Sequence, residues 1–298
     1  MSRVFDAFLF YNELDLLELR LRELYDDVDF FVITEVDKTF SGKNKPFTYH
    51  LNKERFAEFQ DKIIYNPIIT DDIANYKLKY KYTDMNLGLD YKHQGRLPKE
   101  LPISVKREID HRDSCIVAIT KFAEPEDIIL LSDVDEIPNV LVIRQLRKRP
   151  IFETSYLEMK HYMYRLNCRV QSTWFGTVAF NFTAIQQNSL DNLRYASCDP
   201  ANVPGTPIAN GGWHLSYMGG EKAIEEKLDA LAWQGIRAYL AKVFNFIGIK
   251  KFGSSILGRE DILMQGRRFI DDSEDIVDWP NALRKYPELI RKINGSSK

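Results

Sequence analysis

Short apolar runs alternate with leucines at helical spacing along the first 70 residues of the chain. The segments VFDAFLFYN, VDFFVITE and DKIIYNPII are rich in Val, Ile and Phe, which predicts three buried strands. Between the first two strands, four leucines share one helical stripe: Leu14, Leu17, Leu21 and Leu24. A second helix-like segment, KERFAEFQ, precedes the third strand. This alternation indicates βαβ units with right-handed crossovers, and therefore an α/β fold with a mainly parallel sheet.

The segment VKREIDHRDSCIVAITKFA predicts a further helix, with Ser104 as its N-cap. Arg112 falls on the apolar stripe of this helix, and an arginine that faces the core needs an anion. Glu108, one turn earlier, is the simplest partner, and a phosphate or a neighbouring carboxylate is the alternative. The preceding segment, from Thr70 to Pro102, is rich in Tyr, Lys and turn formers, which predicts a long excursion from the fold.

The second half of the chain begins with the strand-like run DIILL and continues with two further β-like segments, SYLEMKHYMYRL and WFGTVAFNFTAI. A turn-rich stretch and the cluster GGWHLSYMGG follow, and the residues from about 220 to 298 are expected to be largely helical. No internal repeat and no clear linker interrupt this order. We therefore expect one domain over residues 1–298, a mixed sheet flanked by helices, with a helical C-terminal appendage.

Three carboxylates follow the DIILL strand, at Asp133, Asp135 and Glu136. In an extended backbone, residues two apart point to the same side, so the two aspartates would project together at the C-terminal edge of the sheet, where α/β folds bind ligands. Two carboxylates held close resist ionising together unless a cation joins them, and Mg²⁺ or Mn²⁺ is the natural one. A solvated turn is the alternative that needs no metal.

Composition narrows the classes of function. The 298 residues are 44% hydrophobic and 28% charged, with a formal net charge of −2, so no basic field indicates nucleic-acid binding. The three cysteines have neither a metal nor a disulfide spacing. Without a signal-peptide pattern or the ~20 apolar residues of a membrane span, we expect a soluble, cytoplasmic protein. The segment AYLAKVFNFIGIKKFG predicts a buried helix end or, alternatively, a peripheral contact with a membrane surface.

Three separated motifs resemble glycosyltransferase family 17 and occur in the order expected of it: FLFYNELDLLELRLRELYDDVDFFVITEVDKTFSGKNKP, ILLSDVDEIP and GGWHLSYMGG. This is the family of the β-1,4-mannosyl-glycoprotein 4-β-N-acetylglucosaminyltransferase, and the likeness extends from about Phe8 to Met218. The resemblance implies a GT-A fold, a nucleotide-sugar donor (most often UDP-GlcNAc), a divalent metal, and inversion at the anomeric carbon.

The resemblance also implies roles for individual residues. Asp133 and Asp135 match the family's Asp-x-Asp motif, with Asp135 as the more direct metal ligand. His214 of the GWH triplet is the expected third ligand, and packing beside a tryptophan is its alternative. Donor-binding residues are expected at the strand ends, in the TFSGKNKP loop, on the helix before the motif and at the motifs themselves: Asn12, Glu13, Glu35, Lys43, Lys45, Arg107, Arg112, Asp133 and Trp213.

An inverting displacement needs a carboxylate base within hydrogen-bond reach of the attacking hydroxyl. Three carboxylates are expected for this role, and the sequence does not choose among them: Glu136, Glu260 and Asp261. Four aromatic residues are expected as walls around the sugar, with core packing as the alternative: Tyr162, Tyr164, Trp174 and Trp213.

These expectations predict a metal-dependent inverting glycosyltransferase. It would move a sugar, GlcNAc from UDP-GlcNAc, to the hydroxyl of a glycan or of a lipid-linked saccharide. One alternative is a non-catalytic nucleotide- or sugar-binding protein on a GT-A scaffold. The other is a nucleotidyltransferase, although the FYNELDLL segment lacks the Gly-rich basic loop that is typical of that class.

Overall fold

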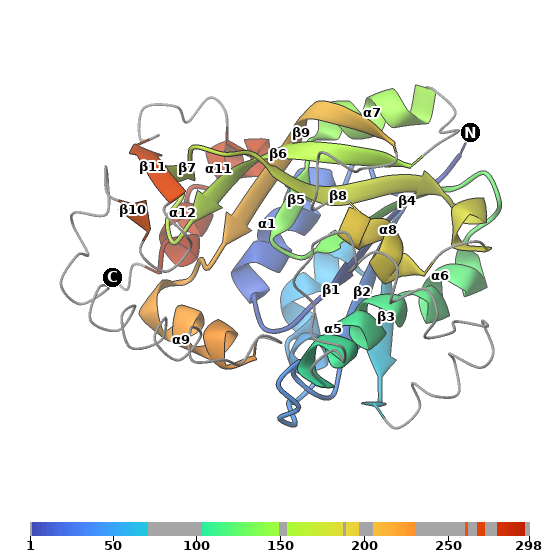
Figure 1. Cartoon of the computed structure of the whole chain (residues 1–298), viewed down its shortest axis with the longest axis horizontal. Helices are drawn as coiled ribbons and strands as arrows, with labels where there is room; N and C mark the ends of the chain where they lie inside the picture. Colours follow the sequence, from blue (N-terminus) through green and yellow to red (C-terminus); the bar gives the residue numbers. More distant parts are fainter. Residues whose placement is uncertain are drawn as a thin grey trace, which may run out of the picture.

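The computed structural model describes residues 2–70, 103–148, 154–186, 189–196, 205–230, 260–261, 267–271 and 279–295. These residues form a mixed sheet covered by helices (Figure 1). Its strands are β1 (Val4–Leu9), β2 (Phe30–Val36), β3 (Ile63–Ile68), β4 (Ile128–Asp133), β5 (Glu136–Pro138), β6 (Ser155–Met163), β7 (Cys168–Val170), β8 (Trp174–Asn181), β9 (Thr206–Ser216), β10 (Glu260–Asp261) and β11 (Arg267–Asp271). The strand order is β10-β11-β7-β6-β8-β4-β1-β2-β3, and β9 pairs with β5 and β6. The predicted α/β fold, a mixed sheet flanked by helices, is confirmed.

The part of the sheet that carries the site is parallel. β1 pairs in parallel with β2 and with β4, and β2 pairs in parallel with β3, so the three strands predicted from the N-terminal pattern are confirmed. On β1, Val4 and Phe8 face one core cluster while Phe5 and Ala7 face the other, and all four are fully buried. This is the pattern of a strand covered by helices on both faces. The sheet continues beyond β4 through the antiparallel strand β8.

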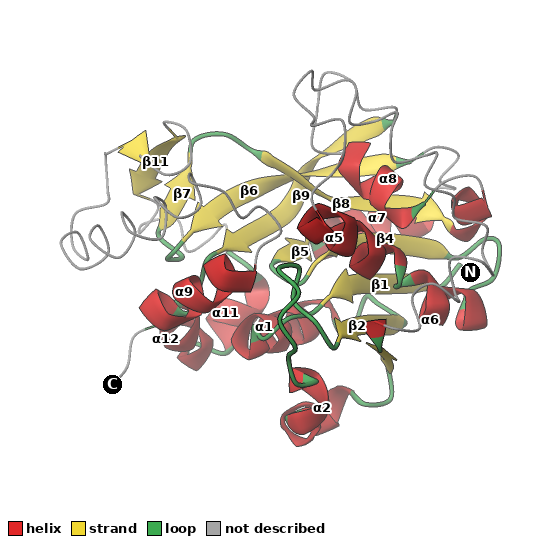
Figure 2. Cartoon of the chain, turned by 60° about the horizontal axis from the view of Figure 1, so that its bottom comes forward, coloured by secondary structure: helices red, strands yellow, loops and turns green. Residues whose placement is uncertain are grey.

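Helices cover both faces of the sheet (Figure 2). One face packs against α1, α7, α11 and α12, and the other against α6 and α8. The predicted leucine stripe of α1 is confirmed, because Leu17, Leu21 and Leu24 are fully buried and Leu14 packs at the border of the core. The described helices are α1 (Leu14–Leu24), α2 (Thr48–Leu51), the 3₁₀ helix Lys53–Phe59, α5 (Ile103–Asp113), α6 (Ile116–Phe122), α7 (Val140–Lys148), the 3₁₀ helix Phe182–Gln186, α8 (Leu190–Ala196), α9 (Gly220–Ala230), α11 (Asn281–Lys285) and α12 (Glu288–Ile293).

The helix predicted before the acidic motif is divided into α5 and α6. The break lies at Ser114, whose hydroxyl donates to the backbone carbonyl of His111 over 2.6 Å. Such a local hydrogen bond competes with the helical ladder. The predicted N-cap at Ser104 is wrong, since α5 includes this residue.

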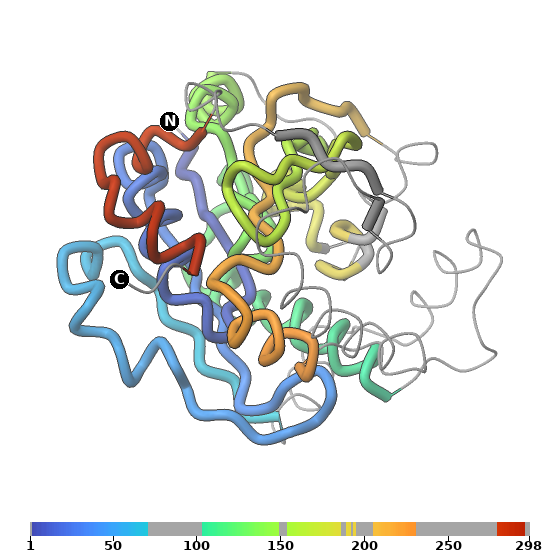
Figure 3. Tube along the Cα trace, turned by 90° about the vertical axis from the view of Figure 1, so that its left-hand side faces the viewer, coloured from blue at the N-terminus to red at the C-terminus, as the bar shows by residue number. Residues whose placement is uncertain are grey.

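The C-terminal part of the chain returns to the N-terminal half, and Figure 3 shows α11 and α12 beside α1. Glu23 of α1 accepts hydrogen bonds from the backbone N–H of Ala282 (2.6 Å) and the side chain of Asn281 (3.2 Å). This region also contains the strands β10 and β11, so the largely helical prediction is wrong there. The predicted excursion from Thr70 to Pro102, apart from Thr70 itself, and the predicted membrane-contact segment (238–253) lie outside the described residues. Among the helices that are described, none has the length and apolar character to cross a membrane.

Candidate active site

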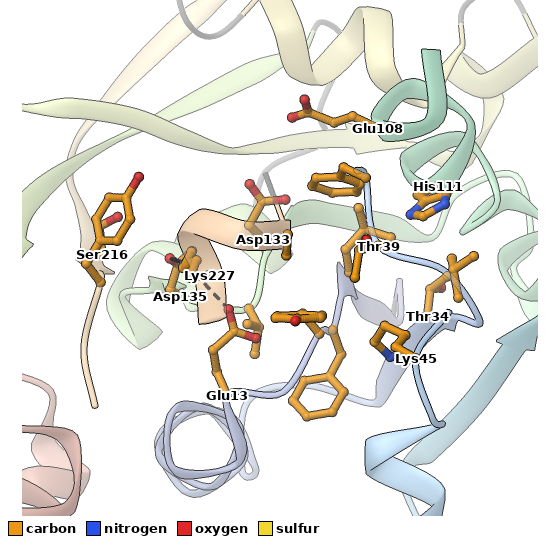
Figure 4. Close-up of a pocket in the computed structure, with 18 of the residues that line it drawn as sticks. Glu13, Thr34, Thr39, Lys45, Glu108, His111, Asp133, Asp135, Ser216 and Lys227 are labelled. Carbon is orange, nitrogen blue, oxygen red and sulfur yellow. Dashed lines mark hydrogen bonds and ion pairs between the residues drawn. The ribbon is translucent and has the colours of Figure 1, made fainter. Parts of the chain in front are cut away.

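A pocket of about 300 Å³ opens at the C-terminal ends of β1, β2 and β4 (Figure 4). In the two parallel ladders, Leu9 of β1 lies opposite both Thr34 of β2 and Asp133 of β4, so the three strands end in one place. Open α/β sheets bind ligands at this edge. Six residues that the sequence predicted for the site line this pocket: Glu13, Lys45, Asp133, Asp135, Trp174 and His214.

The turn with the acidic motif is held by Arg20 of α1. Its fully buried guanidinium forms an ion pair with the buried Asp6 of β1, with Nη2 2.5 Å from Oδ1. Nη1 also donates to the backbone carbonyls of Asp133 (3.1 Å) and Glu136 (2.6 Å), and Nη2 donates to Ser132 Oγ (2.6 Å). A buried guanidinium requires acceptors for its donors. Because these acceptors belong largely to the motif backbone, Arg20 fixes the position of the turn.

Asp133 is the more exposed carboxylate of the motif, with 38% of its side chain accessible. Its two oxygens lie 3.7 Å from Arg112 and 3.7 Å from Arg194. Arg112 also pairs with Asp191 and, at 3.2 Å, with Glu108. The prediction that Arg112 faces inward onto an anion is therefore confirmed. The two arginines place positive charge near Asp133, but at 3.7 Å neither is within hydrogen-bond distance of it.

Asp135 is buried and faces a lysine that the sequence reasoning missed. Lys227 of α9 places its ammonium 2.6 Å from Asp135 Oδ2 and 3.5 Å from Glu13 Oε1. Burial alone would raise the pKa of Asp135, but the charges of Lys227 and His214 outweigh it and hold this pKa well below its usual range. Conversely, burial opposes the charged form of Lys227, but Asp135 and Glu13 raise its pKa. The pair is therefore ionised, and the ammonium of Lys227 is the cation closest to Asp135 Oδ2 among the described residues.

His214 lies beside Asp135 in a group of aromatic rings. Its Nε2 is 3.7 Å from Asp135 Oδ2, which exceeds hydrogen-bond distance. The imidazole is stacked on His161, with ring centroids 4.5 Å apart, and lies 4.6 Å from the ring of Trp174. His214 Nδ1 is buried and has no hydrogen-bond partner among the described residues. Register explains the position, because His214 of β9 lies directly opposite Glu136 of β5 and beside His161 of β6.

Glu136 is fully buried, and its carboxylate has several donors. Oε1 accepts hydrogen bonds from Trp174 Nε1 (2.6 Å) and from Arg194, and Oε2 accepts from the backbone N–H of Asp133 (3.0 Å). It is not one of the pocket-lining residues. These contacts give Glu136 a role in holding Asp133, Trp174 and Arg194, whereas a base requires access to the attacking hydroxyl.

Glu35, at the end of β2, organises the loop that follows rather than facing the pocket. Its carboxylate accepts hydrogen bonds from Lys45 Nζ (2.9 Å), Tyr65 Oη (3.0 Å) and the backbone N–H of Tyr49 (3.1 Å) and Thr48 at the start of α2. A carboxylate at a helix N-terminus also meets the positive end of the helix dipole. Through this network Glu35 positions Lys45, which does line the pocket.

Four other predicted residues do not line the pocket: Asn12, Lys43, Arg107 and Trp213. Asn12 donates to Glu226 of α9 (2.9 Å), and Lys43, 65% exposed, lies 3.7 Å from Asp229. Arg107 packs over Gly42, whose φ of +92° and lack of a Cβ permit this approach. Trp213 is buried in the core, and the side chains of Glu260 and Asp261 lie outside the description.

The opposite end of the pocket is formed by Phe40 and His111, whose ring centroids are 5.2 Å apart. His111 is 3% exposed, and its Nε2 has no hydrogen-bond partner in the described part of the chain. Burial, supported by the charges of Lys45 and Arg107, lowers the pKa of His111 to about 3. This end of the pocket therefore offers an apolar wall and a neutral imidazole with an unsatisfied nitrogen.

The sequence model of glycosyltransferase family 17 matches residues 1–82 and 73–227, which together form most of the chain. The chain belongs to glycosyltransferase family 17. No protein of curated function matches it. Among solved structures it is similar to HddC from Yersinia pseudotuberculosis, at 10% identity and a TM-score of 0.34, over 72% of this chain and 91% of that one. A complex of HddC with GMP-PN matches at 9% identity and a TM-score of 0.31, over 63% and 80% of the two chains.

The divalent metal implied by the resemblance to family 17 can be tested against the donors in the pocket. Within the described ranges, no group of three or more His, Cys, Asp or Glu side chains is arranged to hold a metal. Asp135 and His214 nevertheless fit as a pair, because 3.7 Å is close to the roughly 3.0–3.6 Å between two donors that share one ion with bonds near 2.1 Å. Mg²⁺ sites often use one or two carboxylates and take the remaining ligands from substrate phosphates and water. The pair suits such an ion if Lys227 leaves Asp135.

Several pocket residues of this family 17 chain were not found from the sequence. Lys227 was missed because it lies in a segment whose charges are typical of a solvated helix face. His111 and His161 lie on a helix and a strand with no motif around them. The GWH triplet did provide a usable signal, because it indicated that His214 belongs near the acidic motif.

Proposed function

We propose that this glycosyltransferase uses a nucleotide-sugar donor, UDP-GlcNAc, and transfers GlcNAc with inversion to the hydroxyl of a glycan or lipid-linked saccharide. The observation that carries the proposal is the pairing of Asp135 with His214 at the end of β4, beside a pocket with an apolar end. A diphosphate needs a cation, and two of the donors suited to holding one are present there.

The donor's diphosphate would lie at the Asp135 end of the pocket. A Mn²⁺ or Mg²⁺ ion held by Asp135 and His214 would stabilise the negative charge of the departing diphosphate. Lys45 lines the same pocket and is positioned by Glu35, so it supplies a second positive charge for the phosphates. Asp133 lies 3.7 Å from both Arg112 and Arg194. It would orient groups around the ion rather than contact the uracil.

The uracil base would lie at the other end, against Phe40 and His111. The neutral imidazole of His111 has one unsatisfied nitrogen, Nε2, which suits a hydrogen bond to an edge of the base. Tyr11, at the end of β1, lines the same pocket. The charged end and the apolar end together match a molecule that carries a diphosphate at one side and a planar base at the other.

The sugar would lie against Trp174, which lines the pocket beside His161 and His214. An aromatic face of this kind suits the apolar face of a pyranose. The other predicted walls are placed differently: Tyr162 and Trp213 are buried in the core, and Tyr164 packs on Tyr217 at a centroid distance of 5.9 Å. Trp174 is therefore our choice for the sugar-facing residue.

The base that activates the acceptor hydroxyl is assigned to Glu108 of α5. It lines the pocket, and burial raises its pKa, with Asp133 reinforcing the shift against Arg112. A carboxylate with a raised pKa is a better proton acceptor near neutral pH. Glu136 has Oε1 engaged by Trp174 and Arg194 and Oε2 engaged by the backbone N–H of Asp133, so it is a weaker choice. Glu260 and Asp261 remain predictions from the sequence.

The acceptor and the place of action extend the proposal further. We expect the enzyme to act in the cytoplasm, with the segment from 238 to 253 as the region that would contact a membrane if the acceptor is lipid-linked. A vesicle-flotation assay with anionic liposomes tests this contact. Loss of that segment's lysines (Lys242, Lys250 and Lys251) should then abolish flotation.

The proposal is tested by release of UDP from UDP-GlcNAc in the presence of Mn²⁺, with a panel of other nucleotide sugars alongside. Asp135→Asn should lose release, whereas Glu54→Gln, a surface control on the 3₁₀ helix, should retain it. Full activity in Asp135→Asn would remove the metal from the proposal. Binding of UDP-GlcNAc without any turnover would favour the non-catalytic alternative, and pyrophosphate release from UTP with a sugar phosphate would favour a nucleotidyltransferase.

A further inference from the structure

We propose that Lys227 is a tethered cation that holds Asp135 before metal binds, and that a divalent metal displaces its ammonium from Asp135 toward Glu13. The inference rests on the proposed function, because it assumes that Asp135 and His214 receive the metal. It adds a residue of α9 that sets the metal affinity of the site.

The contacts of Lys227 are those of a cation in a metal's place. Its ammonium lies 2.6 Å from Asp135 Oδ2, the same oxygen that lies 3.7 Å from His214 Nε2. A divalent ion between Asp135 and His214 would therefore meet an ammonium already on its carboxylate ligand. Two cations at one buried carboxylate oxygen repel each other strongly because the site is poorly solvated. The lysine and the metal must exchange rather than bind together.

Glu13 provides the second position for the ammonium. Its Oε1 lies 3.5 Å from Lys227 Nζ, beyond the close contact made with Asp135 but within ion-pair distance. Glu13 itself is fixed at the start of α1, where its Oε2 accepts from the backbone N–H of Asn12 over 3.1 Å. An ammonium that leaves Asp135 can therefore stay paired inside the pocket, and its charge is not left without a partner.

The exchange needs only a movement of the lysine side chain. The last turn of α9 is attached to the rest of the site by Asn12 Nδ2 to Glu226 (2.9 Å), Ser41 Oγ to the carbonyl of Asp229 (2.9 Å) and the Ser41 N–H to the carbonyl of Ala230 (3.1 Å). These contacts hold the helix backbone at the edge of the pocket. The lysine has a flexible four-carbon stem and a compact ammonium, which can change rotamer while the helix stays in place.

The test is a titration of the full-length, nucleotide-free protein with Mn²⁺, followed by calorimetry and by the loss of the free-manganese paramagnetic resonance signal. Lys227→Met should bind Mn²⁺ at least tenfold more tightly than the natural protein, because the competing cation is gone. Lys222→Met is the matched control on the same helix; its side chain is 90% exposed, and its Mn²⁺ affinity should change by less than twofold.

Glu13→Gln provides a change of opposite sign. Without Glu13, the displaced ammonium has no second partner, so Mn²⁺ should bind several-fold more weakly. In a Lys227→Met background the same Glu13→Gln substitution should alter the affinity by less than twofold, since no ammonium needs to move. If Lys227→Met does not fold, Lys227→Arg, which keeps the charge, and Glu13→Gln still test the proposal: both should bind Mn²⁺ no more tightly than the natural protein.

Three outcomes would overturn the inference. Unchanged or weaker Mn²⁺ binding in Lys227→Met means that the lysine does not compete with the metal. The inference also fails if neither the natural protein nor Lys227→Met binds Mn²⁺. If the natural protein binds UDP in EDTA and Lys227→Met does not, the lysine itself is the cation that binds the diphosphate. The proposed function is judged separately, by UDP release from UDP-GlcNAc in the natural protein, so a failure of the cation exchange can be told apart from a failure of the proposed function.

Discussion

Arg20 Nη1 donates a hydrogen bond of 2.6 Å to the backbone carbonyl of Glu136, from a guanidinium that no solvent reaches. This contact joins the helix after the first strand to the turn after the fourth. The ion pair of Arg20 with Asp6 neutralises the buried charge and directs the remaining donors at the turn. The geometry of the acidic motif is therefore set from the interior of the protein, by residues that do not line the pocket.

Arg20→Met should lower the free energy of unfolding by about 3 to 5 kcal/mol, because it leaves Asp6 buried without its cation. Denaturant unfolding measures this loss. Arg144→Met is the control, since Arg144 and Asp27 form a pair in which the arginine is 54% exposed, and its loss should lower the stability far less than the loss of Arg20. An Arg20→Met protein as stable as the control variant would contradict the role given to Arg20.

Glu108→Gln should lower kcat by about 10²- to 10⁴-fold, the usual contribution of a general base, while the Kd for UDP-GlcNAc changes little. Steady-state UDP release and calorimetric donor binding separate the two quantities. The fold should be retained, because Glu108 is partly exposed and a neutral glutamine can still accept from Arg112.

Glu136→Gln should behave differently from Glu108→Gln. It removes a buried charge from Arg194, so the main effect should be a loss of about 3 to 5 kcal/mol of stability. Thermal and denaturant unfolding measure it. A Glu136→Gln protein that is as stable as the natural one but inactive would instead return the role of base to Glu136.

The buried His111 should make the stability of the protein depend on pH. Its pKa is lowered to about 3 in the folded protein, against about 6.5 in the unfolded chain, so below pH 6.5 only the unfolded chain takes up the proton. The stability that it contributes is complete above pH 6.5 and falls by close to 1.4 kcal/mol for each pH unit below it, until pH 3.

Unfolding of His111→Gln at pH 7, 6 and 5 checks this dependence. The difference in free energy between the natural protein and the variant should shrink as the pH falls. A constant difference over this range would show that His111 titrates normally. The same variant should bind UDP more weakly at pH 7.5 if Nε2 contacts the base.

The N-terminal half of the fold could be predicted because its signals are local. Strand β1 alternates between two buried faces, and the leucines of α1 recur at helical spacing, so pattern alone indicates the parallel block. The break at Ser114 was missed because one hydroxyl-to-carbonyl bond interrupts a segment whose apolar period continues through it. The strands β10 and β11 were missed because β11 joins the sheet by pairing with β7, about 100 positions earlier in the chain, and β10 joins it only through β11.

The site could be predicted only in part. Asp133 and Asp135 were expected to share one environment, since both follow the strand and project from one turn. They line the same pocket, but Asp133 is 38% accessible among arginines while Asp135 is buried against Lys227. The difference arises from α5, α8 and α9, which approach the turn from separate parts of the chain. No local pattern around the motif contains that information.

The roles of Glu35 and Glu136 could not be predicted from the sequence either. Both are acids at strand ends; from the sequence, Glu35 was expected to bind the donor and Glu136 was one of three candidates for the base. In the structure Glu35 accepts hydrogen bonds from Lys45, Tyr65 and the backbone at the start of α2. Glu136 accepts hydrogen bonds from Trp174 and Arg194. An acid at a sheet edge can thus position the pocket residues instead of binding the ligand, and only the tertiary contacts distinguish the two roles.

The most direct test of the account is a crystal structure with Mn²⁺ and UDP, with the manganese located from its anomalous scattering. We predict a peak between Asp135 Oδ2 and His214 Nε2, the diphosphate beside it, the uracil against Phe40 and His111, and the ammonium of Lys227 moved to Glu13. A structure in which UDP binds elsewhere, and Lys227 stays on Asp135 with no manganese at this place, would contradict the account.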